Sequence, residues 1–425
     1  MIVTERCCRH CGSRLDSILT LGDLYPSCFP YADECWPPRV PLDLCACTSC
    51  RLVQLRHTVD PDSLYKDHYW YHSGINEVMR AELADIVTQG IARVGRFRYA
   101  DRVLDVGAND GTLLAEYRKH HPTLNVPRIA YEPASNLQPI LSRRAEVRYQ
   151  DYFPPSAQHL KGFSGRVKIL TSIAMFYDLD DPHAFVEAVK TVLHPEGVWI
   201  VQFQDLHQMM QANAFDNICH EHLVYYSLES FERLIAQHGL CVVDAEARAI
   251  NGGSYRLYVK HETATTTVGA SSGRVDALRK AEAGCQDWHT LERFAWRVGQ
   301  VRAQLQAIIE QYVKSGQIID IYGASTKGNT LCQYVGLDES CIRQAIERSP
   351  EKVGRRTVTG IPIVSEQTAR DNPADAWLCN IWQFREAVLT REQQYLAHGG
   401  SIIFPLPSVE VVRERASRPA TSSTV

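Results

Sequence analysis

The stretch Val103–Gly111 constrains the fold of this chain most, because it joins a buried strand, a tight turn and the start of a helix. It reads V-L-D-V-G-A-N-D-G, and its apolar residues before the turn are typical of a central strand in a parallel sheet. Gly107 permits a sharp turn at the carboxyl end of this strand, and Gly111 lets a helix begin close to a ligand. Since open α/β sheets bind ligands at such turns, the stretch predicts an α/β protein with a ligand site here.

The spacing of the glycines distinguishes between two classes of ligand. A dinucleotide fold carries G-x-G-x-x-G around a pyrophosphate, whereas this turn has G-x-x-x-G with a carboxylate before each glycine. Two carboxylates repel a phosphate and suit a ligand that has hydroxyls and an amine. The motif D-V-G-x-x-x-G resembles the first motif of class I S-adenosylmethionine (SAM) methyltransferases. The alternative interpretation is a glycine turn of another α/β protein. The resemblance implies that SAM is bound by Asp105, Gly107, Asn109, Asp110 and Gly111.

Acidic and aromatic residues follow the next two predicted strands. Glu132 ends the strand 128–132, where a carboxylate can accept both ribose hydroxyls of the ligand; the alternative is a surface glutamate. After the strand 147–149, Asp151 can accept the adenine amine and Phe153 can stack on the ring, although aspartate is common in loops. We therefore expect these three residues to contribute to SAM binding.

Cysteine pairs near the N-terminus predict a metal site. Cys8 and Cys11 form one C-x-x-C knuckle and Cys47 and Cys50 form a second, so four thiolates can close a tetrahedral zinc site. Because no coordination position stays open, the zinc is expected to be structural. The proline-rich loop between the knuckles is expected to be too irregular to bury much core. The alternative is a set of free buried thiols.

The overall composition excludes several classes of function. The 425 residues have a net charge of −4 and no long basic run, so nothing points to nucleic acid or an anionic membrane. The chain has neither an apolar signal core at its N-terminus nor an apolar run of membrane-spanning length. Its 14 cysteines are better explained as metal ligands and buried thiols than as disulfides. We expect a cytoplasmic enzyme that is a monomer or a weak homo-oligomer.

The segment 65–74 is unusually rich in aromatic and imidazole side chains. It includes Tyr69 and Tyr71, and a helix is predicted to follow over residues 75–94. One interpretation is a packing seam between two domains. The other is that these tyrosines reach over the active site.

The run His220-Glu221-His222 carries the most reactive side chains. A zinc protease needs histidines at i and i+4 on one helical face, whereas these lie at i and i+2. The run therefore indicates a general acid/base cluster, in which the glutamate orients a histidine or raises its basicity. The alternative is a hydrogen-bonded cap beside a helix that begins near Ser227.

A second strand, glycine-rich turn and helix begin near Ile318. The turn carries G-x-x-x-x-G without the lysine of a P-loop, which excludes that class of NTPase. Gly323, Ser325 and Lys327, together with the helix N-terminus, can hold a pyrophosphate. Between the two α/β parts, residues 270–299 are predicted to be helical.

Taken together, these ordered motifs resemble the zinc-containing, SAM-dependent C-methyltransferases that act on nucleotide-linked keto-deoxysugars. The resemblance implies a class I methyltransferase (Rossmann-like) core, an N-terminal zinc-binding domain and a second, C-terminal Rossmann-like α/β domain. The expected boundaries are 1–72 for the zinc-binding domain, 73–262 for the SAM-binding domain, 263–300 for a helical linker, 301–412 for the C-terminal domain enclosing the nucleotide sugar, and 413–425 for a flexible tail.

The resemblance also implies a mechanism. A base removes the proton beside the sugar ketone, and the enolate carbon takes the methyl group. By similarity His222 is the base, Glu221 and His220 orient it or bind sugar hydroxyls, and Tyr69 and Tyr71 hold the enolate or the sugar. The same resemblance assigns Tyr225, Ser325 and Lys327 to substrate binding.

Two departures from the family leave the substrate open. Cys219 stands where many members carry tyrosine, and the segment 172–178, whose end should face the methyl group, lacks an expected asparagine and histidine. Two other hypotheses therefore stand beside the C-methyltransferase. One is an O- or N-methyltransferase of a small natural product, and the other is a non-catalytic module that binds SAM or a nucleotide sugar.

Overall fold

The computed structural model describes residues 2–265 and 272–414, and the chain divides into two compact units. Unit 1 comprises Met1–Pro26, Pro38–Gln211 and Ile218–Ala295, and unit 2 comprises Ser27–Pro37, Ala212–Asn217 and Trp296–Val425. The predicted domains are continuous ranges, whereas each unit combines several separate segments, so the predicted boundaries stay a prediction. From residue 415 onward, the predicted tail lies outside the described residues.

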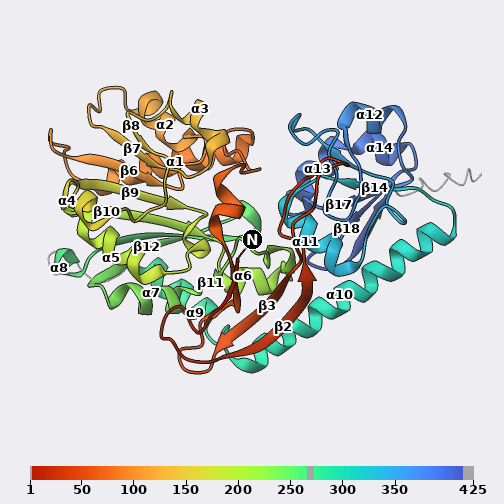
Figure 1. The fold of residues 1–425 in the computed structure, drawn as a ribbon, viewed down its shortest axis with the longest axis horizontal. Coiled ribbons are helices and arrows are strands. Elements are labelled where there is room, and N and C mark those ends of the chain that lie inside the picture. Colours follow the sequence, from red (N-terminus) through yellow and green to blue (C-terminus); the bar gives the residue numbers. More distant parts are fainter. Residues whose placement is uncertain (1, 266–271, 415–425) are drawn as a thin grey trace, which may run out of the picture. The chain divides into compact units, whose positions relative to one another are not determined.

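A seven-stranded sheet forms the centre of unit 1 and has the order β12-β13-β10-β9-β6-β7-β8 (Figure 1). The strands are β6 (Arg102–Val106), β7 (Arg128–Tyr131), β8 (Val147–Tyr149), β9 (Val167–Ile173), β10 (Leu193–Phe203), β12 (Leu240–Arg248) and β13 (Ser254–His261). Strands β6 to β10 run parallel, and β13 runs antiparallel to both β10 and β12. The predicted strands and the predicted terminal hairpin are confirmed, and this is the class I methyltransferase fold.

Helices lie between these strands, and the longer ones, such as α1, α5 and α7, bury apolar residues. They are α1 (Glu77–Arg93), α2 (Thr112–His120), α3 (Gln138–Leu141), α4 (Ala157–Lys161), α5 (Pro182–Val192), α6 (Leu206–Gln211), α7 (Leu228–Ala236), α8 (Glu262–Thr265) and α9 (Gly273–Glu282). Helix α1 begins where the Asn76 side chain accepts from the Val78 amide, and it buries Ile86 and Val87. A Cβ at Gly90 would lie 3.1 Å from Ile200 of β10, so this helix packs closely on the sheet.

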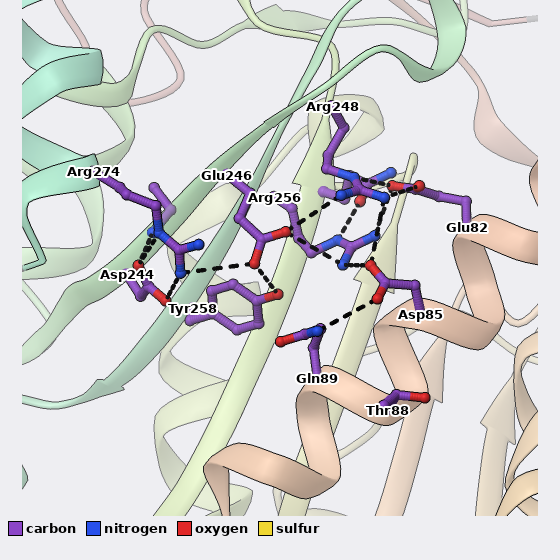
Figure 2. Close-up of polar contacts among 12 residues, drawn as sticks. Glu82, Asp85, Thr88, Gln89, Asp244, Glu246, Arg248, Arg256, Tyr258 and Arg274 are labelled. Atoms are coloured by element: carbon purple, nitrogen blue, oxygen red, sulfur yellow. Dashed lines mark hydrogen bonds and ion pairs between the residues drawn. The ribbon is translucent and has the colours of Figure 1, made fainter.

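A network of charges ties α1 to the antiparallel edge of this sheet (Figure 2). Arg256 of β13 is fully buried and pairs with Glu82 at 2.7 Å and with Asp85 at 2.6 Å, both on α1. Its Nε also donates to Gln202 of β10 at 2.9 Å. Because a buried guanidinium needs such partners, these contacts fix the helix against the strands.

The zinc-binding part of unit 1 is more regular than the sequence suggested. Its four-stranded antiparallel sheet has the order β11-β4-β3-β2, with β2 (Leu15–Leu24), β3 (Val40–Cys47), β4 (Val53–Leu55) and β11 (Val224–Tyr225), while β1 (Val3–Glu5) pairs with β5 (His57–Val59). The expectation that the stretch between the knuckles buries little core is wrong. Strands β2 and β3 form a long hairpin across most of it, and Val40, Leu42 and Leu44 are buried.

Unit 2 contains a six-stranded sheet with the order β16-β15-β14-β17-β18-β19. Its strands are β14 (Ile319–Tyr322), β15 (Gln344–Glu347), β16 (Ile363–Ser365), β17 (Ala376–Cys379), β18 (Ser401–Phe404) and β19 (Glu410–Arg413), and its helices are α11 (Thr326–Val335), α12 (Glu366–Asp371), α13 (Arg385–Arg391) and α14 (Gln393–Ala397). This is the order of a dinucleotide-binding fold, with the point of reversal between β14 and β17. The antiparallel β19 was not predicted. The predicted linker helix is two helices, α9 and α10 (Trp288–Lys314), and the second continues well beyond residue 300.

Candidate active site

The glycine turn lies where β6 ends and α2 begins, as the sequence predicts. Gly107 and Gly111 have φ angles of 68° and 78°, which side-chain-bearing residues rarely adopt. A Cβ at Gly107 would also lie 2.9 Å from Met175 Cγ, so the close approach of this turn to the chain after β9 requires glycine. The glycines therefore let the turn pack closely at the carboxyl edge of the sheet, against Met175 at Gly107 and against Leu141 at Gly111.

Asp105 lies directly under this turn and is almost completely buried. Its Oδ1 accepts a hydrogen bond of 2.6 Å from the Thr171 hydroxyl of β9. Burial, together with the charge of Glu132, raises the pKa of the Asp105 carboxyl to about 7. This carboxyl therefore supports the turn from below and changes its charge near neutral pH.

Glu132 follows β7 and is fixed beside the turn. One of its oxygens accepts from the Asn109 amide at 2.7 Å and the other from the Ala134 amide at 2.9 Å. Burial raises the pKa of this carboxyl. The predicted ribose-binding glutamate thus contacts the predicted SAM-binding turn, which is the placement that its proposed role needs.

The tyrosine-rich segment runs along the same edge and is held there by the turn. Asn109 accepts from the Ser73 amide at 2.9 Å and donates to the Tyr71 carbonyl at 3.0 Å. Asp110 accepts from the Gly74 amide at 3.0 Å. In addition, Asn136, after β7, bonds both the amide and the carbonyl of Tyr69, at 3.0 and 3.1 Å. The segment therefore follows the turn itself, as the active-site interpretation expects.

Asp151 and Phe153, the predicted adenine contacts, differ in their surroundings. Asp151 is exposed, and its side chain accepts from the Tyr152 amide at 2.8 Å. The Phe153 ring is buried edge-on against Tyr131 and Phe185, with both ring centroids at 5.3 Å. These contacts account for Phe153 as part of the core, and its stacking on adenine stays a prediction.

The acid/base cluster lies at the end of β9 and in the loop before β11. The His222 ring contacts Tyr177 edge-on with a centroid separation of 4.6 Å. Asp178 and Glu221 each have one buried carboxylate oxygen without a hydrogen-bond partner among the described residues. The Tyr65 hydroxyl donates to the Glu221 carbonyl at 3.1 Å. Burial raises the pKa of both carboxyl groups, and that of Asp178 is raised further by the charge of Glu221.

Tyr69 connects this cluster to the SAM-binding side. Burial raises the pKa of Tyr69 well above its usual range, and the charges of Asp178, Glu221 and Glu132 raise it further. The phenol therefore lies within electrostatic reach of the acid/base cluster on one side and of the predicted ribose-binding carboxylate on the other. The predicted SAM-binding residues and the predicted acid/base residues thus follow strands of the same sheet.

The remaining residues of the His220–Tyr225 region face the zinc-binding sheet. His220 is buried, its Nε2 lies 3.0 Å from the Val40 carbonyl of β3, and burial lowers its pKa to about 4. Tyr225 belongs to β11, and burial followed by the charge of Cys219 raises its pKa. His220 thus ties the loop to β3, and the predicted role of His222 as the base stays a prediction.

The sequence reasoning did not select Tyr65, Tyr177 or Asp178. Tyr177 and Asp178 form the short turn η3 (Phe176–Asp178) just beyond the carboxyl end of β9. That position is itself a signal, because ligand-binding residues in such sheets follow the strands. Tyr65 precedes the segment held by the turn, and only its hydrogen bond to the Glu221 carbonyl links it to the acid/base cluster.

The four predicted zinc ligands are brought together. The sulfur atoms of Cys8, Cys11, Cys47 and Cys50 all lie within 4.8 Å of one another, and the separations are 3.5 Å for Cys8–Cys50 and 3.4 Å for Cys11–Cys47. A zinc ion with Zn–S bonds of about 2.3 Å requires sulfur separations of about 3.8 Å. The Ser49 and Cys50 amides point at Cys47 Sγ, which favours a thiolate there. The residues fit a structural zinc ion, and all described cysteines are free of disulfides.

Within unit 2, the second glycine turn also has polar residues around it. Gly323 has a φ of 95°, and the Ser325 hydroxyl caps α11 by accepting from the Gly328 amide at 2.9 Å. Asp216 accepts from the Trp382 indole at 2.8 Å, and its second oxygen has no hydrogen-bond partner in the described part of the chain. Burial raises the pKa of Asp216, and the positive charge of Lys327 opposes that rise. A cation and a helix N-terminus therefore lie at this turn.

Three family models match the chain in succession. They describe a zinc binding domain over residues 8–65, a methyltransferase domain over residues 75–245 and a C-methyltransferase C-terminal domain over residues 249–407. Together with the fold and the cluster of four cysteines, they define a SAM-dependent C-methyltransferase with an N-terminal zinc-binding domain. The zinc-containing, SAM-dependent C-methyltransferase class that the motifs predict is thereby confirmed, as are SAM and structural zinc as the expected cofactors, while the sugar substrate stays a prediction.

A curated relative agrees with this class along most of its length. The chain is 28% identical over 374 residues to the C-methyltransferase NovU of Streptomyces niveus, covering 88% of this chain and 87% of the relative. Solved structures with similarity include a SAM-dependent methyltransferase from Clostridium acetobutylicum (12% identity, 43% of this chain, 91% of that chain, TM-score 0.34) and the CcbJ methyltransferase from Streptomyces caelestis (12%, 45%, 93%, 0.34). In residues 2–265 and 272–414, no helix has the length and apolar character needed to cross a membrane.

Proposed function

We propose that this enzyme methylates a carbon atom of a nucleotide-linked keto-deoxysugar. The observation that best supports this proposal is that the acid/base cluster and the glycine turn follow strands of one sheet, with Tyr69 within electrostatic reach of both. O- and N-methylation of an already nucleophilic atom need no such cluster. A carbon beside a ketone does need one, because it becomes a nucleophile only after it loses a proton.

The residues of the cluster then have distinct tasks. When bound, SAM supplies a methyl group activated by a positively charged sulfur. The His222 imidazole takes the α-proton of the acceptor, and the electrons left behind make that carbon the nucleophile. Asp178 and Glu221, each with a buried oxygen that lacks a partner among the described residues, accept hydrogen bonds from hydroxyl groups of the sugar and so orient it beside His222. Tyr69 and Tyr71 hold the sugar between this cluster and the glycine turn.

We assign binding of the nucleotide part of the substrate to the second glycine turn. Lys327, Ser325 and the N-terminus of α11 provide a positive charge and backbone amides, which suit a diphosphate. The family resemblance supports the same assignment. The free cysteines are consistent with a reducing, cytoplasmic location, and we propose a monomer or weak homo-oligomer there.

The proposal is tested by incubating the enzyme with labelled SAM and TDP-, GDP- and CDP-linked 4-keto-deoxysugars in D₂O. We expect one acceptor to gain a methyl group on carbon and to exchange its α-proton. His222→Gln should lower both rates by about 10²–10⁴-fold while SAM binds as before. The exposed His289→Gln is the matched control and should have no effect.

Each of the other results contradicts the proposal in a different way. Methylation on oxygen or nitrogen without α-proton exchange would indicate an O- or N-methyltransferase. SAM binding without methylation of any acceptor would indicate a binding module.

A further inference from the structure

The loop with the acid/base residues is built into the sheet of the zinc-binding part. Strand β11 directly follows His222 and Leu223, and it pairs with β4, with Val224 opposite Gln54. The Leu55 amide of β4 also donates to the Leu223 carbonyl at 2.8 Å. The position of His222 thus depends on how β4 is held.

Besides its pairing with β3, β4 is held by Arg9, which lies between two zinc ligands in the sequence. Its side chain is only 2% exposed although it is charged. One nitrogen donates to the Leu55 carbonyl at 2.6 Å and another to the Thr58 hydroxyl at 2.7 Å. Its backbone amide donates to Gln54 at 2.9 Å. The Arg9 guanidinium, on the first knuckle, therefore contacts β4, the strand that pairs with β11 directly after the loop with His222.

The third contact of Arg9 reaches the other half of the acid/base cluster. Its Nε lies 3.2 Å from Asp180, whose Oδ1 also accepts from the Thr58 hydroxyl at 2.6 Å. Asp180 comes two residues after Asp178. In the same turn, the Tyr177 carbonyl accepts from the Leu223 amide at 2.9 Å. Arg9 is therefore connected to both segments that supply the cluster.

The SAM side of the site is held differently. Asn109 and Asp110 of the glycine turn bond Tyr71, Ser73 and Gly74, as described above. A disturbance at Arg9 is therefore expected to reach the acid/base cluster and to leave SAM binding intact.

We infer that Arg9 is a positioning residue through which the zinc knuckle aligns Tyr177, Asp178 and His222 for proton transfer. The knuckle fixes the backbone of Arg9, and Arg9 adds to the attachment of β4 and, beside Arg6, to that of Asp180. The zinc-binding part thus serves the catalytic side of the active site, in addition to stabilising its own fold. The kinetic test of this inference rests on the proposed function of His222, whereas the structural test does not.

The test compares Arg9→Met with Arg14→Met, whose arginine is 79% exposed in the same part of the chain. For Arg9→Met we expect one zinc per chain and a SAM affinity within about twofold of the parent. Hydrogen–deuterium exchange should rise about tenfold in residues 176–180 and 219–225 and stay unchanged in residues 105–111. With an active acceptor, kcat should fall about 10–100-fold at unchanged KM for SAM, as a small misplacement of reacting groups predicts. Arg14→Met should match the parent.

Asp180→Asn provides a second variant, which keeps the side-chain shape and should give the same pattern at residues 176–180. Unchanged exchange at residues 176–180 in both variants would overturn the inference, as would a loss of SAM affinity in step with kcat. If Arg9→Met does not fold, the exchange pattern of Asp180→Asn decides. The exchange measurement needs no acceptor, so a failure to find a substrate would count against the proposed function and leave this inference standing.

Discussion

Asp105 combines a central position with a carboxyl group that is almost fully buried. Its pKa rises from 3.8 to about 7 because burial penalises the charged form more than the Thr171 hydroxyl stabilises it. A carboxyl with a raised pKa holds its proton more tightly in the folded protein than in the unfolded chain. Its contribution to the free energy of unfolding is therefore largest at acidic pH, falls as the pH rises towards 7, and is constant above that value.

Asp105→Asn should remove this pH dependence, because asparagine keeps the shape and the acceptor oxygen but has no proton to lose. We expect the stability of the variant relative to the parent to grow between pH 5 and pH 7, by at most about 1.4 kcal/mol per pH unit. Urea denaturation at several pH values measures this difference. The exposed Asp276→Asn is the control, and parallel profiles for Asp105→Asn and the parent would contradict the expectation.

Residues within short motifs were the most predictable part of the site. Gly107, Glu132 and the four zinc ligands each belong to a local pattern whose chemistry depends on spacing along the chain. Asp178 was marked only by its place in the segment after β9, and Tyr65 only by its place in the aromatic-rich segment 65–74. Their roles arise from burial and from contacts with Glu221, which is distant in sequence, so the folded chain was needed to find them.

At the scale of elements, helix α1 is attached to β13 by charge as well as by apolar packing. Arg256 has no exposed surface, and each of its nitrogens faces a partner on α1 or β10. Glu82 and Asp85 are also paired with Arg248, at 2.6 and 3.4 Å, so these acids share two arginines. The attachment therefore depends on both arginines.

Arg256→Met should lower the free energy of unfolding by about 1–3 kcal/mol, because charge-assisted hydrogen bonds to Glu82, Asp85 and Gln202 are lost while Arg248 still pairs with both acids. Arg279→Met, which breaks a partly exposed pair with Glu232, should cost only about 0–1 kcal/mol. Urea denaturation of both variants provides the comparison. Equal losses would show that burial does not determine the effect.

Elements with a strong local signal were predicted, and those that depend on distant pairing were not. The alternation of apolar strands and helices gave most of both parallel sheets. The β2–β3 hairpin was missed because the prolines between the knuckles suggested irregular chain. Strand β11 has only two residues, and nothing local marks it as a partner of β4.

At the scale of the whole molecule, two α/β units are expected to divide the recognition of two substrates. The first carries the SAM-binding turn and the acid/base cluster. The second has the strand order of a dinucleotide-binding fold, with Ser325 and Lys327 at its glycine turn. This division predicts that substitutions in the second unit affect the acceptor alone.

Lys327→Met should raise KM for the nucleotide-linked acceptor about tenfold and leave the dissociation constant of SAM unchanged, because a charge-assisted contact to phosphate is lost. Lys314→Met, at an exposed lysine paired one helical turn away, is the matched control. Steady-state kinetics and calorimetry provide the two readouts. An acceptor KM equal to that of the parent would remove Lys327 from the phosphate site.

The pairing of β11 with β4 also has a consequence for biosynthesis. The ribosome releases β2, β3 and β4 early, whereas Val224 and Tyr225 emerge only after most of the methyltransferase core has been made. Until then, one edge of the zinc-binding sheet lacks its partner and offers open backbone groups to neighbouring nascent chains. Completion of the N-terminal sheet is thus delayed until the loop that carries His222 has been synthesised.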